Sequence, residues 1–443
     1  MSALTQTDEA TPAAHAPLTV WHKCGLVAFA LIIVAFACLV ERRSALRPPG
    51  ERRMTDAGVY FRAGWAVRSG ADLYHVTDDN DWHYNYPPLL AILMTPLADA
   101  PDGESRDGLL PYPLSVAIWF ALNLLFAVVA VYWLAQALEE LSPDAEVRST
   151  PWGCRAWWLR RMAPLLICLA PIAHTLSRGQ VNLILLLLVA GMLRAIVRGH
   201  NGQAGWWLAG AVCLKIIPAF LLIYPLWRRD WRLLGGCTGG LVIGLALIPC
   251  VVFGPQRTMQ YYQDLDRFVL RPGLTHAGDD SRAKELTNMT GTGSQSFLVV
   301  WHNTLHPDRL TRPDHAASWL RMTAYGMAGI VTLITLWAAR RRIQQRGALD
   351  AAETYLAWGA LILAMLFASP ISHMHYQCLC LPLVMGLLVL HPPRGWKRLG
   401  WCGLAGLFIA AHILPHLPEI TELRDFGLAM YAALLMWAVA VAV

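Results

Sequence analysis

The sequence predicts an all-α, polytopic membrane protein. Of its 443 residues, 56% are hydrophobic and only 15% are charged, and the mean hydropathy is +0.41, whereas a soluble domain has about 25% charged residues. Several apolar runs reach the length of about 20 residues that a spanning helix needs. They lack the alternation over about 10 residues that is typical of barrel strands. We therefore expect a disordered tail over residues 1–20 and a single transmembrane domain over residues 21–443.

Composition and short motifs exclude several classes of function. The net charge of +6 is explained by the excess of Lys and Arg in cytoplasmic loops, so we expect no nucleic-acid partner. The ten cysteines show no CxxC pair or metal-ligand spacing, which is typical of small hydrophobic residues. Walker, GxSxG, Rossmann and HExxH motifs do not occur. We expect no nucleotide-driven chemistry, no cofactor and no metal ion.

The apolar segments predict about 10–12 transmembrane or re-entrant helices. The first segment lacks a small-residue cleavage site, so we expect it to be retained as a span. The predicted segments are 24–40, 114–138, 163–177, 180–197, 205–214, 216–227, 234–253, 319–339, 353–369, 375–391, 399–415 and 423–443.

Basic residues give the expected orientation. With Lys23 in the cytoplasm, all five later basic clusters also lie there only if 205–227 is a broken or re-entrant pair, because a single span would turn every cluster after it outward. Pro218 offers a place for the break. Both termini then lie in the cytoplasm, and the long loops 41–113 and 254–318 face outward. The clusters are Arg148, Arg155, Arg160 and Arg161; Arg194 and Arg198; Arg228, Arg229 and Arg232; Arg340, Arg341, Arg342 and Arg346; and Arg394, Lys397 and Arg398.

The first outer loop, from Met54 to Ala98, is the most informative stretch. It is longer than a connection needs to be, and we expect it to fold on the membrane surface and to carry function. Asp56 is a candidate general base that takes the proton from an acceptor hydroxyl. Its alternative role, which is compatible with the first, is to cap a helix that starts at Ala57. Further candidate substrate contacts in this loop are Tyr60, Arg62 and Tyr86.

An acidic turn in the same loop has two interpretations. The residues Asp79-Asn80-Asp81 match a DxD pattern that binds metal and sugar. Asp and Asn also bond to their own backbone in turns, and this turn chemistry alone explains the pattern.

Two polar positions inside the later apolar segments fall on the same outer side. The turn Arg178-Gly179-Gln180-Val181-Asn182 precedes a helix, so its N–H groups can bind an anion; an interfacial arginine with a helix cap is the alternative. Lys215 lies inside an apolar segment, where charged residues usually mark function, although a lysine can also extend to the interface. We expect Arg178 and Lys215 to hold a phosphate, and Gln180 and Asn182 to contact substrate.

Two further turns complete one polar cavity that opens outward. His373 and His375 are spaced i and i+2, a spacing that does not suit a shared metal ion. One of the two histidines is expected to bond a phosphate oxygen, and we choose His375 for this role, with His373 near the substrate. The alternative is that the ring bonds to the backbone. Gln295 belongs to a polar turn that either contacts a ligand or caps the helix after it.

The order of these motifs resembles glycosyltransferase family 87 over about residues 24–391. The residues that carry the resemblance are Asp56, Tyr60-Phe-Arg-Ala-Gly64, Gly70-Ala-Asp-Leu-Tyr74, Tyr86-Pro-Pro, Pro96, Gly179-Gln180-Val-Asn182, Leu214-Lys215-Ile-Ile-Pro218 and Ser369-Pro-Ile-Ser372. The family's catalytic Asp falls on Asp56, its Lys-Pro segment on Lys215 and the first His of its Ser-Pro-x-Ser-Trp-x-His-His turn on His375. Its Asn-Gln-Ser turn is matched by 294–296. The sequence departs from the family at His373, where the family has Trp, and at Tyr376, where it often has a second His.

The resemblance implies a GT-C-type fold and a transferase of the inner membrane with its active site on the periplasmic face. It implies transfer of a hexose, mannose in the known members, from a polyprenyl-phosphate donor to a lipid or glycan hydroxyl, with inversion. The expected partners are this donor, the acceptor and membrane lipids. The alternative is a secondary transporter or a flippase of lipid-linked sugars without chemistry. Transporters usually contain internal repeats, and this sequence has no matching halves.

Overall fold

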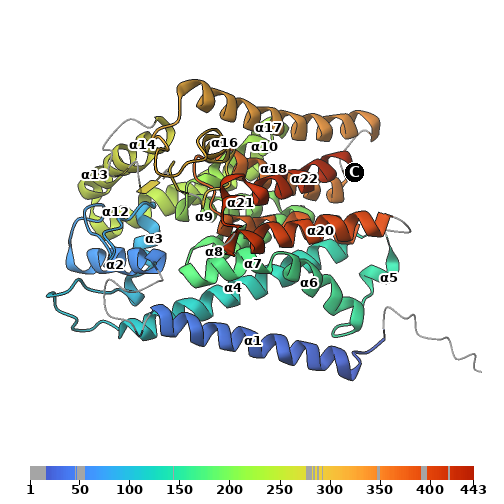
Figure 1. Cartoon of the computed structure of the whole chain (residues 1–443), viewed down its shortest axis with the longest axis horizontal. Coiled ribbons are helices and arrows are strands. Elements are labelled where there is room, and N and C mark those ends of the chain that lie inside the picture. The colour runs from blue at the N-terminus through green and yellow to red at the C-terminus, as the bar shows by residue number, and fades with distance from the viewer. Residues whose placement is uncertain are drawn as a thin grey trace, which may run out of the picture.

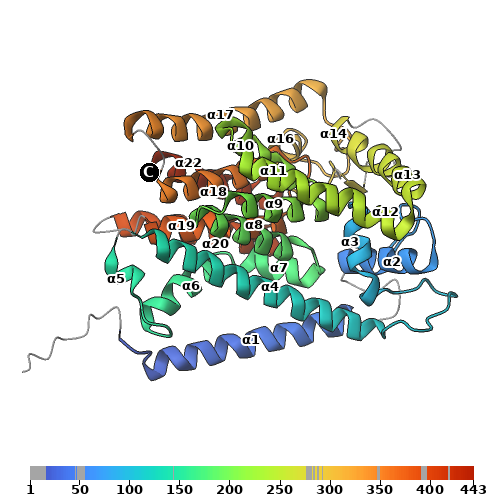
Figure 2. The ribbon, with the colours of Figure 1, turned by 180° about the vertical axis from the view of Figure 1, so that it is seen from behind.

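The predicted all-helical class is confirmed by the computed structural model, which describes residues 16–44, 46, 55–142, 144–275, 282, 285–286, 289–291, 293–346, 350–390, 397–417 and 420–443. Long helices run side by side along the longest axis of the molecule (Figures 1 and 2). Within these ranges, β-structure is limited to two isolated bridges, Thr77–His83 and Ser294–His373. Most of the predicted tail, residues 1–15, lies outside the described residues, and the single-domain assignment stays a prediction.

The helices follow one another with short connections. The first ten are α1 (Val20–Ser44), α2 (Thr55–Ser69), α3 (Pro88–Leu93), α4 (Tyr112–Leu141), α5 (Ala145–Arg148), α6 (Arg155–Ile167), α7 (Leu169–Arg178), α8 (Asn182–Val197), α9 (Asn201–Leu214) and α10 (Ile223–Arg228). The later ones are α11 (Trp231–Leu241), α12 (Ile248–Phe253), α13 (Pro255–Leu265), α14 (Arg271–Thr275), α16 (Phe297–Leu305), α17 (Ser318–Arg346), α18 (Ala351–Ala368), α19 (Leu381–Leu390), α20 (Lys397–Ile413), α21 (Glu422–Asp425) and α22 (Leu428–Ala442). Tighter or wider helical turns are η2 (Thr95–Leu97), η3 (Ile217–Leu222), η4 (Val242–Leu247), η5 (Asp266–Leu270), η6 (Met374–Cys380) and η7 (Leu414–His416).

Six of the described helices are long and apolar enough to cross a membrane, and the pair α6–α7, bent by 66°, raises this number to seven if it counts as one span. The six are Val20–Ser44, Tyr112–Leu141, Trp231–Phe253, Ser318–Gln345, Ala351–Ala368 and Arg398–His416. Four shorter apolar helices are Asn182–Val197, Ile217–Arg228, Met374–Leu390 and Leu428–Ala442. Each of the twelve predicted segments coincides with one of these helices or with α9, so the multi-pass architecture is confirmed.

Local sequence signals explain where several helices begin. Asp350 accepts a hydrogen bond from the backbone of Glu353, whose side chain accepts one in return, so α18 starts with a capping box. Asp230 accepts from the Leu233 N–H at the start of α11. Prolines occupy the first turns of α3 and α4, where a missing N–H costs no helical bond.

The predicted break in 205–227 is confirmed, but it lies at Lys215 instead of at Pro218. Helix α9 ends at Leu214, and Lys215 has an extended backbone with φ −153° and ψ 127°. Pro218 follows in the first turn of η3, where a proline is tolerated. The break places Lys215 next to Asn182 of α8, at one end of the bundle.

Small residues fix the position of α9 and therefore of Lys215. A Cβ atom on Gly205 of α9 would collide with the carbonyl oxygen of Leu233, and one on Gly236 of α11 would collide with that of Gly202. Such close backbone approach is typical of small residues at helix interfaces in membranes. The α9–α11 contact therefore fixes the level along the bundle axis at which α9 ends.

The part of the loop that the structure describes, residues 55–98, is folded, as predicted, and forms a cap at one end of the bundle around α2 and α3 (Figure 1). Tyr60, Phe61 and Tyr74 of this loop are fully buried. Gly64 lets α2 approach α3, because a Cβ atom there would lie 2.5 Å from the Met94 carbonyl oxygen. The cap holds Asp56 in the first turn of α2.

Arg62 holds this cap together, and its expected contact with substrate stays a prediction. Its Nε donates to the Asp99 carbonyl at 3.1 Å, Nη1 to the Thr77 carbonyl at 3.1 Å, and Nη2 to Asp79 Oδ1 at 2.8 Å. The residue is only 6% exposed. All three nitrogens of the guanidinium are therefore engaged within the loop.

Replacing Arg62 by Ala should destabilise the cap by about 3–5 kcal/mol, because it breaks a buried ion pair with Asp79 and two hydrogen bonds to backbone carbonyls. The measurement is the thermal unfolding of the purified chain in detergent. Arg68→Ala on the same helix is the matched control, because Arg68 is exposed and donates only to Gly108. A direct substrate contact would instead show as a changed KM with an unchanged melting temperature.

Candidate functional site

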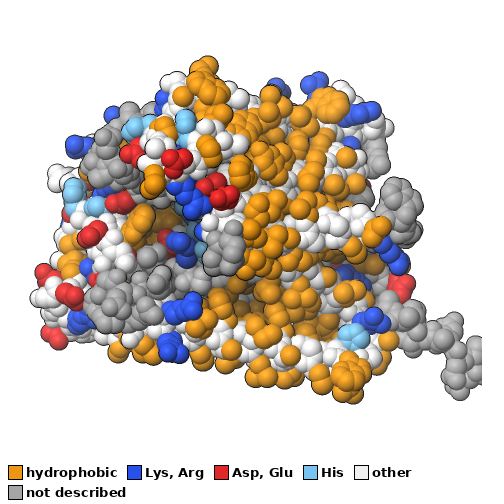
Figure 3. Space-filling model, in the orientation of Figure 1, with side chains coloured by type: hydrophobic (Ala, Val, Ile, Leu, Met, Phe, Trp, Pro, Cys, Tyr) orange, Lys and Arg blue, Asp and Glu red, His pale blue; other side chains and the backbone are white. Residues whose placement is uncertain are grey.

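The candidate site lies at the end of the bundle where the cap covers the polar ends of several helices. Helix α2 contacts α7, and η6 contacts α7, α8 and α18. Figure 3 shows this end hollowed, with Lys or Arg and His side chains gathered at the hollow. Segments that are far apart in the sequence therefore contribute to one polar region.

Asp56 points its carboxylate toward Arg178. Arg178 Nη1 lies 3.7 Å from Asp56 Oδ2, and the Asp56 side chain is 24% exposed. The Oδ2 atom is buried and accepts no hydrogen bond within the described part of the chain. Because α2 begins at Thr55, Asp56 lies inside the first turn and does not cap a helix from Ala57. The helix dipole favours a negative charge there, and one lone pair remains available for a substrate proton.

The surroundings shift the acidity of this carboxyl group in two directions. Burial raises the pKa of Asp56, and the positive charges of Arg178 and Lys215 oppose this increase. Both cations therefore lie within electrostatic reach of Asp56. A carboxylate with a raised pKa is a stronger base than an exposed one.

Two tyrosines and a glutamine connect the cap to the bundle beside Asp56. The Tyr60 hydroxyl lies 3.0 Å from Gln180 Oε1 and 3.0 Å from the Tyr86 hydroxyl. Because the amide oxygen only accepts, Tyr60 donates to Gln180 and accepts from Tyr86. These three predicted residues thus meet, and they form one wall of the region that contains Asp56.

Lys215 lies at the inner side of the same region. Its Nζ donates to Asn182 Oδ1 at 3.3 Å. It also lies 3.8 Å from the centroid of the Tyr376 ring and 5.5 Å from that of Tyr86. Lys215 is 9% exposed. The two rings orient a buried ammonium group without neutralising it.

Four imidazole rings extend from this region in a row. The centroids of His373 and His375 are 5.3 Å apart, those of His375 and His174 also 5.3 Å, and those of His174 and His416 5.4 Å. Neither ring nitrogen of His375 has a hydrogen-bond partner among the described residues, although the residue is 2% exposed. Burial, together with the charges of Arg178 and Lys215, lowers the pKa of His373 to about 4. The row therefore lines a polar region rich in positive charge.

The glycine turn after Arg178 differs from the prediction. Gly179 has a left-handed backbone with φ 68°, and it ends α7. The N–H groups of Gly179 and Gln180 donate to the carbonyls of Leu176 and Thr175. The turn is a helix C-cap, so these two N–H groups are not free to bind an anion. The side chain of Arg178 provides the positive charge instead.

The Gln295 side chain bonds to the backbone of a distant segment. It donates to the Arg424 carbonyl at 3.0 Å and accepts from the Met430 N–H at 3.2 Å. It is 1% exposed, so its amide links this turn to α21 and α22, and its expected contact with substrate stays a prediction.

The carboxylate of Asp78, directly before the DxD pattern, bonds to the backbone of its own turn. Asp78 accepts from the N–H groups of Asn80 and Trp82, each at 2.9 Å, and Asp79 pairs with Arg62. The turn interpretation of the DxD pattern therefore accounts for both residues. Among the described residues, no group of three or more His, Cys, Asp or Glu side chains could hold a metal ion.

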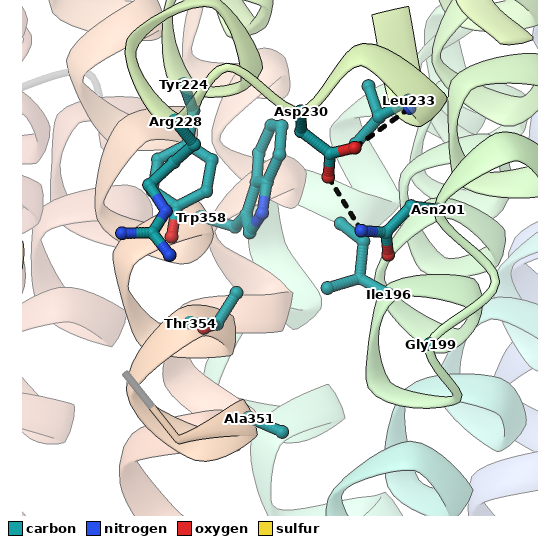
Figure 4. Close-up of a pocket in the computed structure, with 10 residues that line it drawn as sticks. All are labelled: Ile196, Gly199, Asn201, Tyr224, Arg228, Asp230, Leu233, Ala351, Thr354 and Trp358. Atoms are coloured by element: carbon teal, nitrogen blue, oxygen red, sulfur yellow. Dashed lines mark hydrogen bonds between the residues drawn. The ribbon is translucent and has the colours of Figure 1, made fainter. Parts of the chain in front are cut away.

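A separate pocket of about 310 Å³ lies at the opposite end of α8, α9 and α18, because it is lined by the last turn of α8 and the first turns of α9 and α18. Asp230 accepts there from Asn201 at 2.7 Å and from the Leu233 N–H at 3.1 Å (Figure 4). Its central polar groups thus bind one another, and it lacks the unpartnered polar atoms of the candidate site.

Comparison with known protein families agrees with this geometry. The model of glycosyltransferase family 87 matches residues 84–370, which is more than half of the chain. The chain belongs to glycosyltransferase family 87. It is therefore a membrane glycosyltransferase, and the resemblance seen in the sequence motifs is confirmed.

Relatives of this family 87 chain include two mycobacterial enzymes. Each is a polyprenol-phosphate-mannose-dependent alpha-(1-2)-phosphatidylinositol mannoside mannosyltransferase. The one from Mycolicibacterium smegmatis is 26% identical over 88% of this chain and 82% of its own length. The one from Mycobacterium tuberculosis is 27% identical over 78% of this chain and 71% of its own length. Among solved structures, ArnT from Cupriavidus metallidurans in the apo state is 14% identical, with a TM-score of 0.42 over 94% of this chain and 77% of that one.

Sequence reasoning missed two members of this family 87 site. His174 lies four residues before Arg178, which donates to its Nε2 at 3.2 Å, so the i, i+4 spacing on one helix face was an available signal. His416 is contributed by η7, directly after α20. Only the three-dimensional packing identifies it.

Proposed function

We propose that this chain transfers a hexose, mannose, from a polyprenyl phosphate to a hydroxyl group of a lipid or glycan acceptor. The observation that carries the proposal is the meeting of a carboxylate with cations drawn from distant helices. Among the described residues, Asp56 Oδ2 accepts no hydrogen bond, and Arg178 forms an ion pair with it at 3.7 Å. The donor named for the mycobacterial relatives is a polyprenol phosphate mannose, which fits a site of this charge.

Asp56 acts as the general base. The acceptor hydroxyl attacks the anomeric carbon, its proton passes to the Asp56 carboxylate, and the bond between the anomeric carbon and the phosphate oxygen breaks. The phosphate leaves with the electron pair. Attack from the face opposite the phosphate inverts the configuration. Family membership and the free lone pair of Asp56 support this step.

Arg178, Lys215 and His375 bind the donor phosphate. Arg178 provides a guanidinium that pairs well with phosphate oxygens, and Lys215 provides a buried ammonium held by Asn182 and Tyr376. His375 offers two ring nitrogens without partners. Preorganised positive charge stabilises the phosphate most strongly as its negative charge increases in the transition state.

The active site faces the periplasm, and both termini lie in the cytoplasm. Two observations support this orientation. Helix α1 starts and α22 ends at the end of the bundle opposite the cap (Figure 1). The arginines at the end of α8, the end of α10 and the start of α11 lie at that same end, in agreement with the cytoplasmic bias of basic residues.

The test is to incubate the purified chain with defined polyprenyl-phosphate sugars and to measure released polyprenyl phosphate. Release that depends on the acceptor and prefers the mannosyl donor is expected. Transport of the intact lipid-linked sugar across a proteoliposome membrane, without release, would instead favour a flippase.

The pH dependence of transfer should report the acidity of Asp56. Because a protonated carboxyl group cannot take a proton, kcat/KM should fall as the pH decreases through the raised pKa of Asp56. Arg178→Gln removes a charge that lowers this pKa, so the acid limb should move to higher pH, whatever the loss in overall rate. An acid limb that stays in place or moves to lower pH would contradict the assignment.

A further inference from the structure

The segment after α20 brings two basic side chains to the outer margin of the site. His416 ends η7, and its ring stands at 88° to that of His174 with the centroids 5.4 Å apart. Arg424 lies in α21. Both residues lie beyond residue 370, where the family match ends. They add a group of side chains that the proposed reaction does not use.

This group contains buried polar atoms without partners. Arg178 Nε donates to His174 Nε2, whereas His174 Nδ1 has no hydrogen-bond partner within the described part of the chain. The same holds for Arg424 Nε. Buried polar atoms without partners are rare in native structures. The ring of His174 contacts that of His416 in η7, and α21 contacts η7, so the two atoms indicate a region where a polar ligand completes the hydrogen bonds.

The charge of the group favours an anion. Arg178 and Arg424 both act electrostatically on His174 and His416. The carboxylate nearest to Arg424 in sequence is Asp425, which is bonded to Arg309 at 3.0 Å and to Arg312 at 3.1 Å. These two arginines largely neutralise it.

The group is also more accessible than the inner cations. His416 and Arg178 are exposed, whereas Lys215 and His375 are buried. The row of imidazoles therefore leads from the buried phosphate-binding residues to the surface. A ligand at its outer end would lie at the mouth of the site.

We propose that His174, His416 and Arg424 form an outer anion subsite that binds a phosphate group of a lipid substrate. This group is either the phosphate monoester of the polyprenyl lipid or the phosphodiester of a phospholipid acceptor. The identity of the ligand as a substrate rests on the proposed function, whereas anion binding at these three side chains does not.

The experiment compares variants of the full chain in lipid nanodiscs, with two probes: a polyprenyl phosphate and phosphatidylinositol. Arg424→Gln and His416→Ala should each weaken the binding of at least one probe by about tenfold, the effect of one lost charge-assisted hydrogen bond. Arg424→Lys keeps the charge without the planar fork and should recover part of the affinity. His306→Ala, which removes an exposed histidine elsewhere in the second outer loop, is the matched control.

The pattern of losses identifies the ligand. Weakened binding of polyprenyl phosphate alone assigns the subsite to the polyprenyl lipid that the reaction releases, and weakened binding of phosphatidylinositol alone assigns it to the acceptor. Unchanged affinity for both probes in correctly melting variants would overturn the proposal. If the parent chain transfers no sugar from any donor while these variants still lose lipid affinity, the proposed function fails and the subsite remains.

Discussion

The Asp56→Asn variant is expected to lose sugar transfer by about 10²–10⁴-fold, the range that general-base catalysis contributes. Asn has the same shape as Asp, but its amide cannot take the proton of the acceptor hydroxyl. The donor phosphate is held by other residues, so the affinity for polyprenyl phosphate should stay within a few-fold of that of the parent chain.

Single-turnover transfer of labelled sugar and equilibrium binding of polyprenyl phosphate separate the two effects. Asp107→Asn is the matched control, because Asp107 is an exposed aspartate of the same outer loop whose side chain bonds only to Ser105. Transfer by Asp56→Asn at the parental rate would remove Asp56 from the mechanism. Loss of binding in proportion to activity would make it a substrate contact instead of a base.

The Lys215→Met variant is expected to lower kcat by about 10²–10³-fold, the cost of removing one preorganised donor to the developing charge. Met fills a similar volume, and removing a buried charge does not by itself destabilise a helical core. The melting temperature should therefore stay equal to that of the parent chain or increase.

Transfer rates and thermal unfolding of the same preparation test this second prediction. Lys23→Met makes the same substitution at an exposed position near the start of α1, and it should leave both quantities unchanged. A Lys215→Met variant that melts early would indicate that the ammonium stabilises the break after α9. One that transfers sugar normally would show that the charge is not needed by the leaving phosphate.

Hydropathy and charge patterns predicted the helices well because each signal is local. The break at Lys215 followed from the basic clusters, which a single span would have turned outward. Its position was misjudged by three residues, because Pro218 fits the first turn of η3 and the break needs only the extended backbone of Lys215. A proline indicates that a helix boundary is near, but it can lie either after the end of one helix or in the first turn of the next.

The site was predicted in part. The order of motifs brought Asp56, Arg178 and Lys215 together correctly, because each lies next to a span that ends at the same level. Arg62 and Gln295 were expected to contact substrate, which stays a prediction, and the sequence did not indicate that both bond within the protein. Their partners are backbone carbonyls and N–H groups far away in the sequence, and such partners leave no trace in residue types. His416 was missed for the same reason.

The most direct measurement is a cryo-electron microscopy map of the chain with bound polyprenyl phosphate. The account predicts phosphate density within hydrogen-bond distance of Arg178, Lys215 and His375, with the polar space in front of Asp56 left open for the acceptor. Phosphate density at the opposite end of the bundle, in the pocket beside Asn201 and Asp230, would contradict it.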